Sequence, residues 1–311
     1  MYGESNRECL QQNSDNCLIL PRRVLLTGMT GFIGSHLALK LLEDTKAPWE
    51  IHAVLRESSC IDDLPVALRN HVTFHIHTSS RTLLDIMQDA KPNIVVHLAS
   101  LFLSQHRYED IGALVESNIV FGTKLLEAMK QTGVKNFINV GTAWQHYQNA
   151  DYAPVNLYAA SKQAFEDMLR YFQDTADLKV ITLKLFDTYG SDDKRRKLMS
   201  LLEEIAQSGE CLAMSPGEQK IDMVHVDDVV AAFIMAMEYL LEGRRELCGT
   251  YAVSTKRPIP LRELVTRYEK LIGRSLHIEW GGRPYREREV MEPWSKGELL
   301  PGWERKHKEL M

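Results

Sequence analysis

The chain has 311 residues, of which 44% are hydrophobic and 25% are charged, and its formal net charge is −5. The length suits about two domains, or one large α/β unit with an appendage, and the negative balance offers no basic field for nucleic acid. No apolar stretch approaches the roughly 20 residues that span a bilayer, and five scattered cysteines fit free thiols in a reducing cytoplasm.

Residues 1–21 are mostly polar and lack the basic segment and apolar core of a secretory signal, so we expect a mobile polar extension. The Cys and His spacings contain no pattern typical of a metal site. His75 and His77 would share one face of a strand, but no further ligand is placed near them. We therefore expect no metal, and a cytoplasmic protein that binds neither nucleic acid nor membrane.

From residue 23 to about 190, short β-rich runs alternate with longer helical patterns. The expected strands are 24–27, 51–55, 72–77, 94–98, 137–140 and 180–185, and the expected helices are 32–44, 80–90, 109–132 and 156–176. The strands are continuous apolar runs, such as IVVHLA, which is typical of strands buried on both faces. This alternation predicts an α/β fold with a doubly wound parallel sheet over residues 22–190.

After residue 190 the pattern changes. Helices are expected at 195–208, 227–241 and 261–273, separated by short strands, and no linker marks a domain boundary. We therefore expect residues 191–311 to form a smaller substrate-binding part that is interleaved with the sheet.

Glycine returns every third position directly after the first strand, in TGMTGFIG (27–34). In a strand–turn–helix context such glycines make the tight turn, admit a phosphate and let the helix pack on the strand, as in a Rossmann-type dinucleotide site. The spacing is G-x-x-G-x-x-G rather than the G-x-G-x-x-G of the general fingerprint. The residues expected to contact the cofactor here are Gly28, Thr30, Gly31, Phe32, Ile33 and Gly34.

The second expected strand runs into Arg56, in IHAVLRESS, and carries no carboxylate at its end. A carboxylate at this position takes the ribose 2′-hydroxyl of NAD, whereas a guanidinium pairs with the 2′-phosphate of NADP. Arg56 therefore favours NADP or NADPH as the cofactor, with an ordinary solvated arginine as the alternative.

Tyr158 is the only one of the eleven tyrosines with a lysine, Lys162, four residues later. In a helix the two side chains lie on one face, one turn apart. An ammonium about 5 Å away stabilises a phenolate by roughly 3 kcal/mol, so we expect the pKa of Tyr158 to fall by about 2 units, toward the range of an acid–base catalyst. The alternative is a surface Tyr–Lys pair.

Thr142 ends the strand FINVGT and is expected to face the ligand crevice beside Tyr158, where its hydroxyl can bind a substrate carbonyl.

The ordered set of glycine turn, Thr142, Tyr158 and Lys162 resembles the extended short-chain dehydrogenase/reductase family, over nearly the whole chain after the amino-terminal extension. The segments VVHLAS, ESNIVFGTKLLEAM, LKLFDTYG and VHVDDVV stand where that family has its landmarks. The resemblance implies catalysis by these three residues on a nucleotide-linked sugar, and a homodimer formed through helices 109–132 and 156–176. It also implies cofactor contacts by Leu98, Ala99, Ser100, Asn118, Tyr158 and Lys162.

Thr142 is followed by Ala143, Trp144 and Gln145. Dehydratases of the family resemble Thr-Asp-Glu here, and an elimination without a placed acid and base loses roughly 10²–10⁴-fold in rate. An epimerase-reductase would carry a cysteine in the matching stretch, which this chain lacks, although His146 is close by. Hydride transfer remains, with two alternatives: an epimerase of the same fold, or a non-catalytic NADP-binding regulator.

Longer segments, including GTAWQHY and RPYREREVMEPW, resemble those of the bacterial CDP-abequose and CDP-paratose synthases, a group of NADPH-dependent 4-ketoreductases. The resemblance implies reduction of the C4 ketone of a CDP-linked 4-keto-deoxyhexose, for O-antigen or related deoxysugar biosynthesis. The expected substrate contacts are Thr142, Trp144, Gln145, Asp187, Arg195, Arg196, Arg283 and Arg286. Asp187 stands where many relatives carry asparagine, and a carboxylate would repel phosphate, so a turn-capping or cytosine-side role is equally open.

Overall fold

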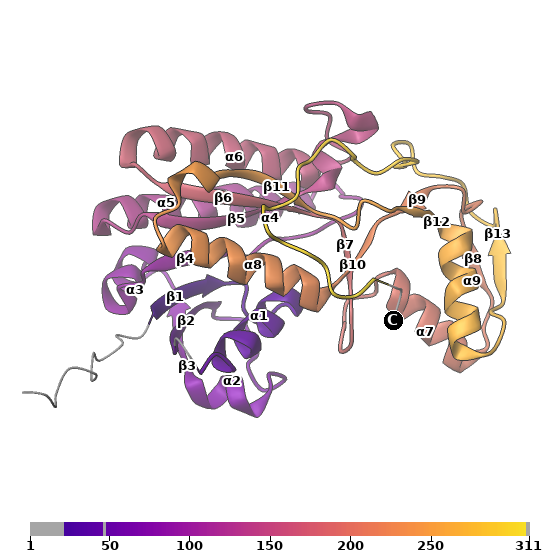
Figure 1. Cartoon of the computed structure of the whole chain (residues 1–311), viewed down its shortest axis with the longest axis horizontal. Helices are drawn as coiled ribbons and strands as arrows, with labels where there is room; N and C mark the ends of the chain where they lie inside the picture. Colours follow the sequence, from indigo (N-terminus) through magenta and orange to yellow (C-terminus); the bar gives the residue numbers. More distant parts are fainter. Residues whose placement is uncertain (1–21, 46–47, 309–311) are drawn as a thin grey trace, which may run out of the picture.

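Seven parallel strands form the central sheet, in the order β11-β6-β5-β4-β1-β2-β3 (Figure 1). The structure is a computed structural model that describes residues 22–45 and 48–308, so the expected extension at 1–21 lies outside the described residues. The strands are β1 (Arg22–Thr27), β2 (Trp49–Arg56), β3 (Val72–His77), β4 (Ile94–His97), β5 (Asn136–Thr142), β6 (Lys179–Leu185) and β11 (Gly249–Val253). The predicted doubly wound α/β fold is confirmed. The strand order reverses between β1 and β4, where ligands bind in such sheets.

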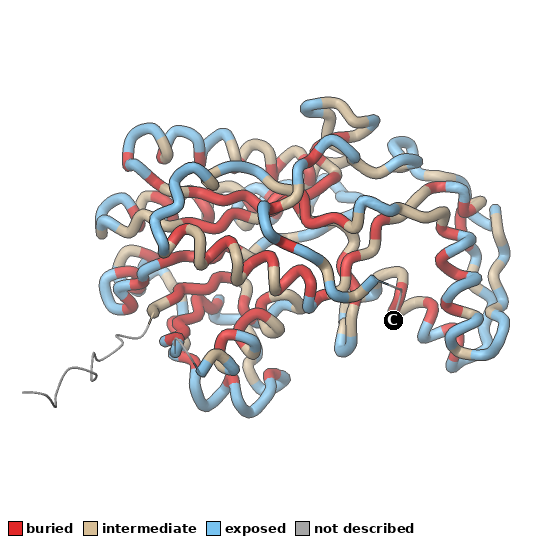
Figure 2. Tube along the Cα trace, in the orientation of Figure 1, coloured by how far each residue is buried: buried red, intermediate tan, exposed pale blue. Residues whose placement is uncertain are grey.

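Helices cover both faces of this sheet. One face packs against α1 (Phe32–Leu42), α2 (Val66–His71) and α8 (Val226–Leu241), and the other against α3 (Leu83–Ala90), α5 (Phe121–Thr132) and α6 (Leu157–Ala176). Neighbouring residues of β1 alternate between the two cores: Leu26 packs with the first set of helices and Leu25 with the second. Figure 2 shows burial concentrated along the strands and the inner sides of the helices. Because burying one such side chain stabilises a fold by about 1.5–3 kcal/mol, a sheet covered on both faces selects continuous apolar strands.

The expected helix 109–132 is not continuous. It consists of α4 (Asp110–Val115), a π-helical turn (Glu116–Val120) and α5. The cause lies in the hydrogen bonds of Asn118 within the π turn, which belong to the candidate site. The other expected helices are present with ends that differ by at most three residues, and α2 is an additional short helix.

Two elements that follow residue 190 belong to the central sheet. Strand β11 extends it beyond β6, and α8 packs beside α1, so that Phe233 and Val253 share a buried core with Val24. The chain therefore leaves the sheet after β6, returns through α8 and β11, and leaves it again.

The remaining elements form a smaller part at the right of Figure 1, with a core of its own. Helices α7 (Leu198–Ser208) and α9 (Leu261–Ile272) lie with three strand pairs. The pairs are β7 (Asp187–Tyr189) with β10 (Met223–His225), β8 (Leu212–Met214) with β13 (Ile278–Trp280) and β9 (Lys220–Ile221) with β12 (Ile259–Pro260). Short 3₁₀ turns span Ala143–Gln145, Tyr147–Asn149 and Arg245–Leu247. Within the described ranges, none of the helices is long and apolar enough to cross a bilayer.

Candidate active site

The glycine turn between β1 and α1 is shaped by close backbone contacts. Gly28 has a φ of +71°, and a Cβ there would lie 2.6 Å from the backbone nitrogen of Ala99. A Cβ on Gly34 would lie 2.4 Å from the carbonyl oxygen of Gly28, so neither position has room for a side chain. Gly31 is exposed at the start of α1, and no acidic side chain occupies the first helical turn. The free N–H groups at this helix end fit the pyrophosphate of a dinucleotide.

The other residues predicted to contact the cofactor surround this turn. Thr30 is exposed, Phe32 and Ile33 are half-buried, and Leu98, Ala99 and Ser100 continue from the end of β4. The Ala99 backbone N–H donates to Thr27 Oγ1 at 3.2 Å, which joins the ends of β1 and β4. Arg56 ends β2 with an exposed side chain that forms no ion pair within residues 22–45 and 48–308. Its guanidinium is open to a phosphate at the edge of the site.

Asn118 uses its whole side-chain amide to tie the loop after β4 to α6. Its Oδ1 accepts from Leu101 N at 2.7 Å and from Ser100 Oγ at 3.1 Å. Its Nδ2 donates to Leu101 O at 3.0 Å and to Ser161 Oγ at 2.9 Å. These partners lie outside its own helix, and the π turn is the local geometry that carries Asn118 to them; such turns are frequent at functional sites. Ser161 Oγ in turn donates to the carbonyl oxygen of Tyr158, at 2.7 Å.

Tyr158 and Lys162 lie one turn apart near the start of α6, which begins after Asn156. Asn156 accepts a hydrogen bond from Ala159 N at 2.9 Å and so caps the helix. The expected net fall in the pKa of Tyr158 is wrong for this structure. Burial raises the pKa of Tyr158 to about 12, partly opposed by the hydroxyl of Ser100. Burial also lowers the pKa of Lys162 to about 8, opposed by the charge of Glu166. Desolvation thus outweighs the pairing that spacing alone suggests.

Thr142 is the last residue of β5 and is almost completely buried. Its Oγ1 accepts from Trp144 N at 3.3 Å and keeps its own hydrogen for a further acceptor. Gln145, predicted to contact substrate, is fully buried instead. Its Oε1 accepts from Thr142 N at 2.9 Å, and its Nε2 donates to Gln163 and Glu166. The amide of Gln145 is committed to the protein, because the 3₁₀ turn after β5 directs it toward α6.

Phe102 is a site residue that the sequence analysis missed. Its ring lies 4.9 Å from that of Tyr158, edge to face, and 5.7 Å from that of Trp144. Lys197 Nζ lies 4.1 Å from the centre of the same ring. Phe102 is 39% exposed although it is large and apolar, as expected of a side chain that lines a binding cleft. Its place directly after β4, at the switch point of the sheet, was the signal available in the sequence.

Charged side chains gather around Asp187, and Lys197 joins this group to the ring of Phe102. Burial raises the pKa of the Asp187 carboxyl, and nearby Lys197, Arg195 and Arg286 oppose that rise. Arg195 also forms a bidentate pair with Asp193 and lies 4.4 Å above the ring of Phe32. The predicted contacts Asp187, Arg195 and Arg286 are thus brought together.

Two other predicted contacts lie apart from this group. Arg196 is exposed and pairs with Glu204 at 3.1 Å, and Arg283 is exposed and does not act on Asp187. Lys197, the residue after Arg196, lies against the ring of Phe102 instead.

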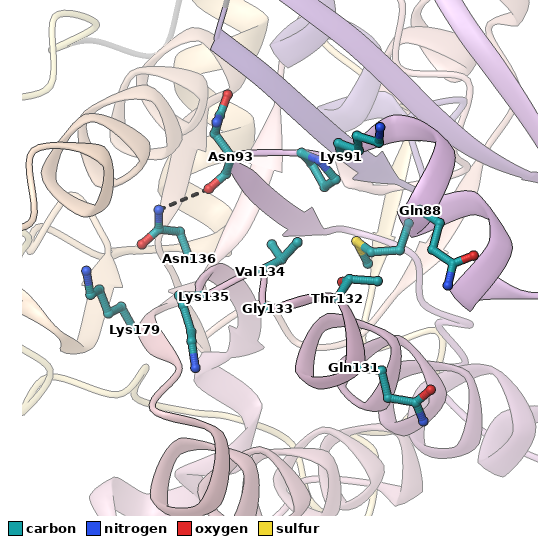
Figure 3. Close-up of a pocket in the computed structure, with 12 residues that line it drawn as sticks. Gln88, Lys91, Asn93, Gln131, Thr132, Gly133, Val134, Lys135, Asn136 and Lys179 are labelled. Atoms are coloured by element: carbon teal, nitrogen blue, oxygen red, sulfur yellow. Dashed lines mark hydrogen bonds between the residues drawn. The ribbon is translucent and has the colours of Figure 1, made fainter.

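A pocket of about 740 Å³ lies at the opposite end of the sheet (Figure 3). It is lined by Asn93, Asn136 and Lys179, beside the amino ends of β4, β5 and β6. Asn136 Nδ2 donates to the Asn93 carbonyl oxygen at 3.0 Å within it. Because open α/β sheets bind ligands at the carboxyl ends of their strands, this pocket is not the candidate active site.

One group of described residues could hold a metal ion. His225, Asp227 and His307 place three ligand atoms within 4.8 Å of one another at the start of α8. His307 follows the other two residues by about eighty positions, so no spacing motif could reveal the group, and the two imidazole rings are stacked at 3.9 Å. The absence of a resident metal stays a prediction.

Comparison with known proteins gives a family and a set of distant relatives. Residues 24–248 match the model of the family described as "NAD dependent epimerase/dehydratase family". The chain is 25% identical to CDP-abequose synthase of Yersinia pseudotuberculosis over 87% of this chain and 91% of that protein. It is equally similar, 25% identical over 90% of each chain, to UDP-glucuronate 4-epimerase of Thermodesulfobacterium geofontis. Among solved structures, the NAD complex of UDP-glucose 4-epimerase of Thermus thermophilus superposes with a TM-score of 0.72 and 25% identity, covering 91% of this chain and 94% of that one.

Proposed function

The chain belongs to the NAD-dependent epimerase/dehydratase family, and we propose that it is an NADPH-dependent reductase of the C4 ketone of a nucleotide-linked 4-keto-deoxyhexose. The observation that carries the proposal is the end of β5. Thr142 stands beside the helix of Tyr158 and Lys162, but is followed by Ala143 and Trp144 where an elimination would need a placed acid and base. This site suits addition of a hydride and a proton, and not loss of water.

The cofactor half of the proposal rests on the glycine turn and Arg56. When bound, NADPH supplies the hydride. The turn at residues 28–34 would hold the pyrophosphate, and Arg56 would pair with the 2′-phosphate that distinguishes NADP from NAD. The loop at Leu98–Ser100, fixed by Asn118, would border the cofactor near the catalytic helix.

The protein's own part of the reaction is to hold the ketone and deliver a proton. The Thr142 hydroxyl donates to the carbonyl oxygen, and the Tyr158 hydroxyl gives up its proton as negative charge grows there. A pKa of about 12 keeps Tyr158 in the protonated form that this direction requires. Lys162, mostly charged at pH 7 with a pKa of about 8, stabilises the phenolate that remains.

The substrate would lie between Phe102, Trp144 and the cluster around Asp187. Lys197 and Arg286 supply positive charge for the diphosphate, and the aromatic rings supply an apolar wall for the deoxysugar. A CDP-linked sugar is favoured by the similarity to CDP-abequose synthase. Such a product would enter O-antigen or related deoxysugar biosynthesis.

The direct test follows NADPH absorbance with CDP-, UDP-, GDP- and dTDP-linked 4-keto-deoxyhexoses side by side. We expect the fastest consumption with the CDP sugar, and a loss of at least about 10²-fold in Tyr158→Phe with unchanged NADPH affinity. Near-normal turnover of Tyr158→Phe would overturn the assignment of the proton donor.

A 4-epimerase is the second candidate, because UDP-sugar 4-epimerases are as similar to this chain as the CDP-sugar enzyme. An epimerase would copurify with tightly held cofactor and interconvert two sugars without net consumption of NADPH. A non-catalytic NADP-binding regulator would show neither reaction, and the presence of Tyr158 with the buried Lys162 one helical turn later argues against it.

We also propose a homodimer in the cytoplasm. Four large apolar side chains are exposed on the outer surfaces of α4 and α6: Ile111, Val115, Met168 and Tyr171. A second copy packed on these helices would bury them, and light scattering of the purified protein tests this. The described cysteines Cys60, Cys211 and Cys248 are free thiols, which suits a reducing compartment.

A further inference from the structure

Gln145 joins the end of β5 to helix α6 through three hydrogen bonds. Its Oε1 accepts from the backbone N–H of Thr142 at 2.9 Å. Its Nε2 donates to Glu166 Oε1 at 3.1 Å and to Gln163 Oε1 at 2.9 Å. The side chain is fully buried, so these bonds are not shared with solvent. One amide therefore connects the strand that presents Thr142 to the helix that presents Tyr158 and Lys162.

Glu166 is the anchor of this connection on α6. It stands one helical turn after Lys162, and its carboxylate pairs with Lys184 Nζ of β6 at 3.4 Å. Lys184 in turn donates to His146 Nε2 at 2.8 Å, and its side chain is 5% exposed. The carboxylate is therefore held from the strand side as well as by its own helix.

The residues around these hydrogen bonds are closely packed. A Cβ on Gly141, the residue before Thr142, would lie 2.8 Å from Glu166 Oε1 and 2.9 Å from Gln145 Oε1. Glycine at this position lets the strand pass close to both side chains. The hydrogen bonds thus define how far Thr142 stands from α6.

We propose that Gln145 and Glu166 are a positioning pair that sets the distance between the Thr142 hydroxyl and the hydroxyl of Tyr158. This inference rests on the proposed reaction, in which both hydroxyls bind one carbonyl oxygen. Neither member of the pair touches the substrate. A displacement of about 1 Å between such groups costs on the order of 10²-fold in rate, while binding of the cofactor on the glycine turn is left intact.

Exchange of the two side chains tests the pair. Gln145→Glu removes the amide donor and places a carboxylate against Glu166, and we expect kcat to fall roughly 10- to 100-fold with little change in KM for NADPH. Gln145→Glu combined with Glu166→Gln reverses the direction of the hydrogen bond and conserves net charge. We expect this double variant to regain at least about tenfold in kcat over Gln145→Glu, because the connection is restored.

Gln163→Glu is the matched control. Gln163 Oε1 accepts from Gln145, and a carboxylate keeps an acceptor there. The substitution also removes the exposed hydrogen bond from Gln163 Nε2 to Asp167 Oδ1, which does not involve β5, so kcat should stay within about threefold of wild type. A Gln145→Glu variant with unchanged kcat and a raised KM for the sugar would make Gln145 a substrate contact and overturn the proposal. A double variant no better than Gln145→Glu would overturn it as well.

Two further measurements test the positioning pair even if a variant fails to fold or the proposed function is wrong. If Gln145→Glu does not fold, Glu166→Asp takes its place: it keeps the charge opposite Lys184 but withdraws the carboxylate by one methylene, and an unchanged kcat would refute the pair. If wild type turns over no sugar, the proposed function is contradicted. Hydrogen exchange of the segment 141–146, faster in Gln145→Glu and restored in the double variant, then decides on the pair alone.

Discussion

The glycine turn at residues 28–34 and the charged cluster around Asp187 both belong to the candidate active site, but they are built differently. The turn is one continuous segment whose shape is fixed by backbone contacts, since a Cβ on Gly28 or Gly34 would collide with neighbouring main chain. The cluster consists of long side chains from separate segments, such as Lys197 and Arg286. From this difference we expect cofactor binding to depend on a few small residues, and substrate choice to depend on side chains that can change one at a time.

Gly34→Ala should have the largest effect, because the new Cβ would lie 2.4 Å from the Gly28 carbonyl oxygen, which is backbone and cannot yield. We expect dinucleotide affinity to fall more than about 100-fold, measured by quenching of protein fluorescence. Gly112→Ala is the control, because a Cβ on Gly112 of α4 meets nothing within 4 Å. A Gly34→Ala variant with normal dinucleotide affinity would show that the turn tolerates substitution, as we expect only of the cluster around Asp187.

Arg56→Ala should have the second-largest effect, and it separates the contribution of Arg56 to cofactor affinity from that of the glycine turn. Loss of a charge-assisted contact to the 2′-phosphate should weaken NADP roughly 10- to 100-fold and leave NAD unaffected. Arg69→Ala, a substitution of another exposed arginine, should change neither affinity. Equal affinities for NADP and NAD in wild type would mean that the second strand does not discriminate between them.

The pH dependence of kcat should report Lys162. Its pKa of about 8 lies below the usual value because burial disfavours the charged form, so its stabilising charge is present below pH 8 and is lost above it. We expect the rate to fall about tenfold per unit above pH 9, with no contribution from Tyr158, whose pKa is about 12. Lys162→Arg should lower the overall rate but remove the alkaline fall, since a guanidinium keeps its proton. If kcat of Lys162→Arg still fell at high pH as in wild type, the fall would belong to another group.

The smallest effects should separate two adjacent residues of the cluster. Lys197→Met should raise KM for the sugar nucleotide roughly three- to tenfold, because its ammonium faces Phe102 and Asp187. Arg196→Met should change KM less than about twofold, because its ion pair with Glu204 is exposed. The reverse order would place the diphosphate on the other side of this segment.

The features that could be predicted from the sequence lie in continuous segments such as the glycine turn, and those that could not depend on residues far apart in the chain. The strands and the glycine turn were predictable because apolar runs and glycine spacing are local patterns. Gln145 was misplaced because its burial depends on Glu166 of α6, 21 residues later in the chain, and no local signal separates a buried amide from one in a cleft. The pKa of Tyr158 was predicted in the wrong direction because pair spacing says nothing about desolvation. Lys197 was not among the expected substrate contacts, although Arg195 and Arg196 were, because three adjacent cations look alike until their side chains are placed.

The π turn at Glu116–Val120 has a consequence for insertions and deletions. Such a turn holds one residue more than the regular helix would need over the same length. Removal of a single residue between α4 and α5 would restore an unbroken α-helix and rotate α4 by about 100° about its axis. Ile111 and Val115 would swing away from their present surface, and the amide at position 118 would lose its reach to Leu101 and Ser161. The one additional residue of the π turn therefore determines both which side chains α4 exposes and how Asn118 holds the candidate active site.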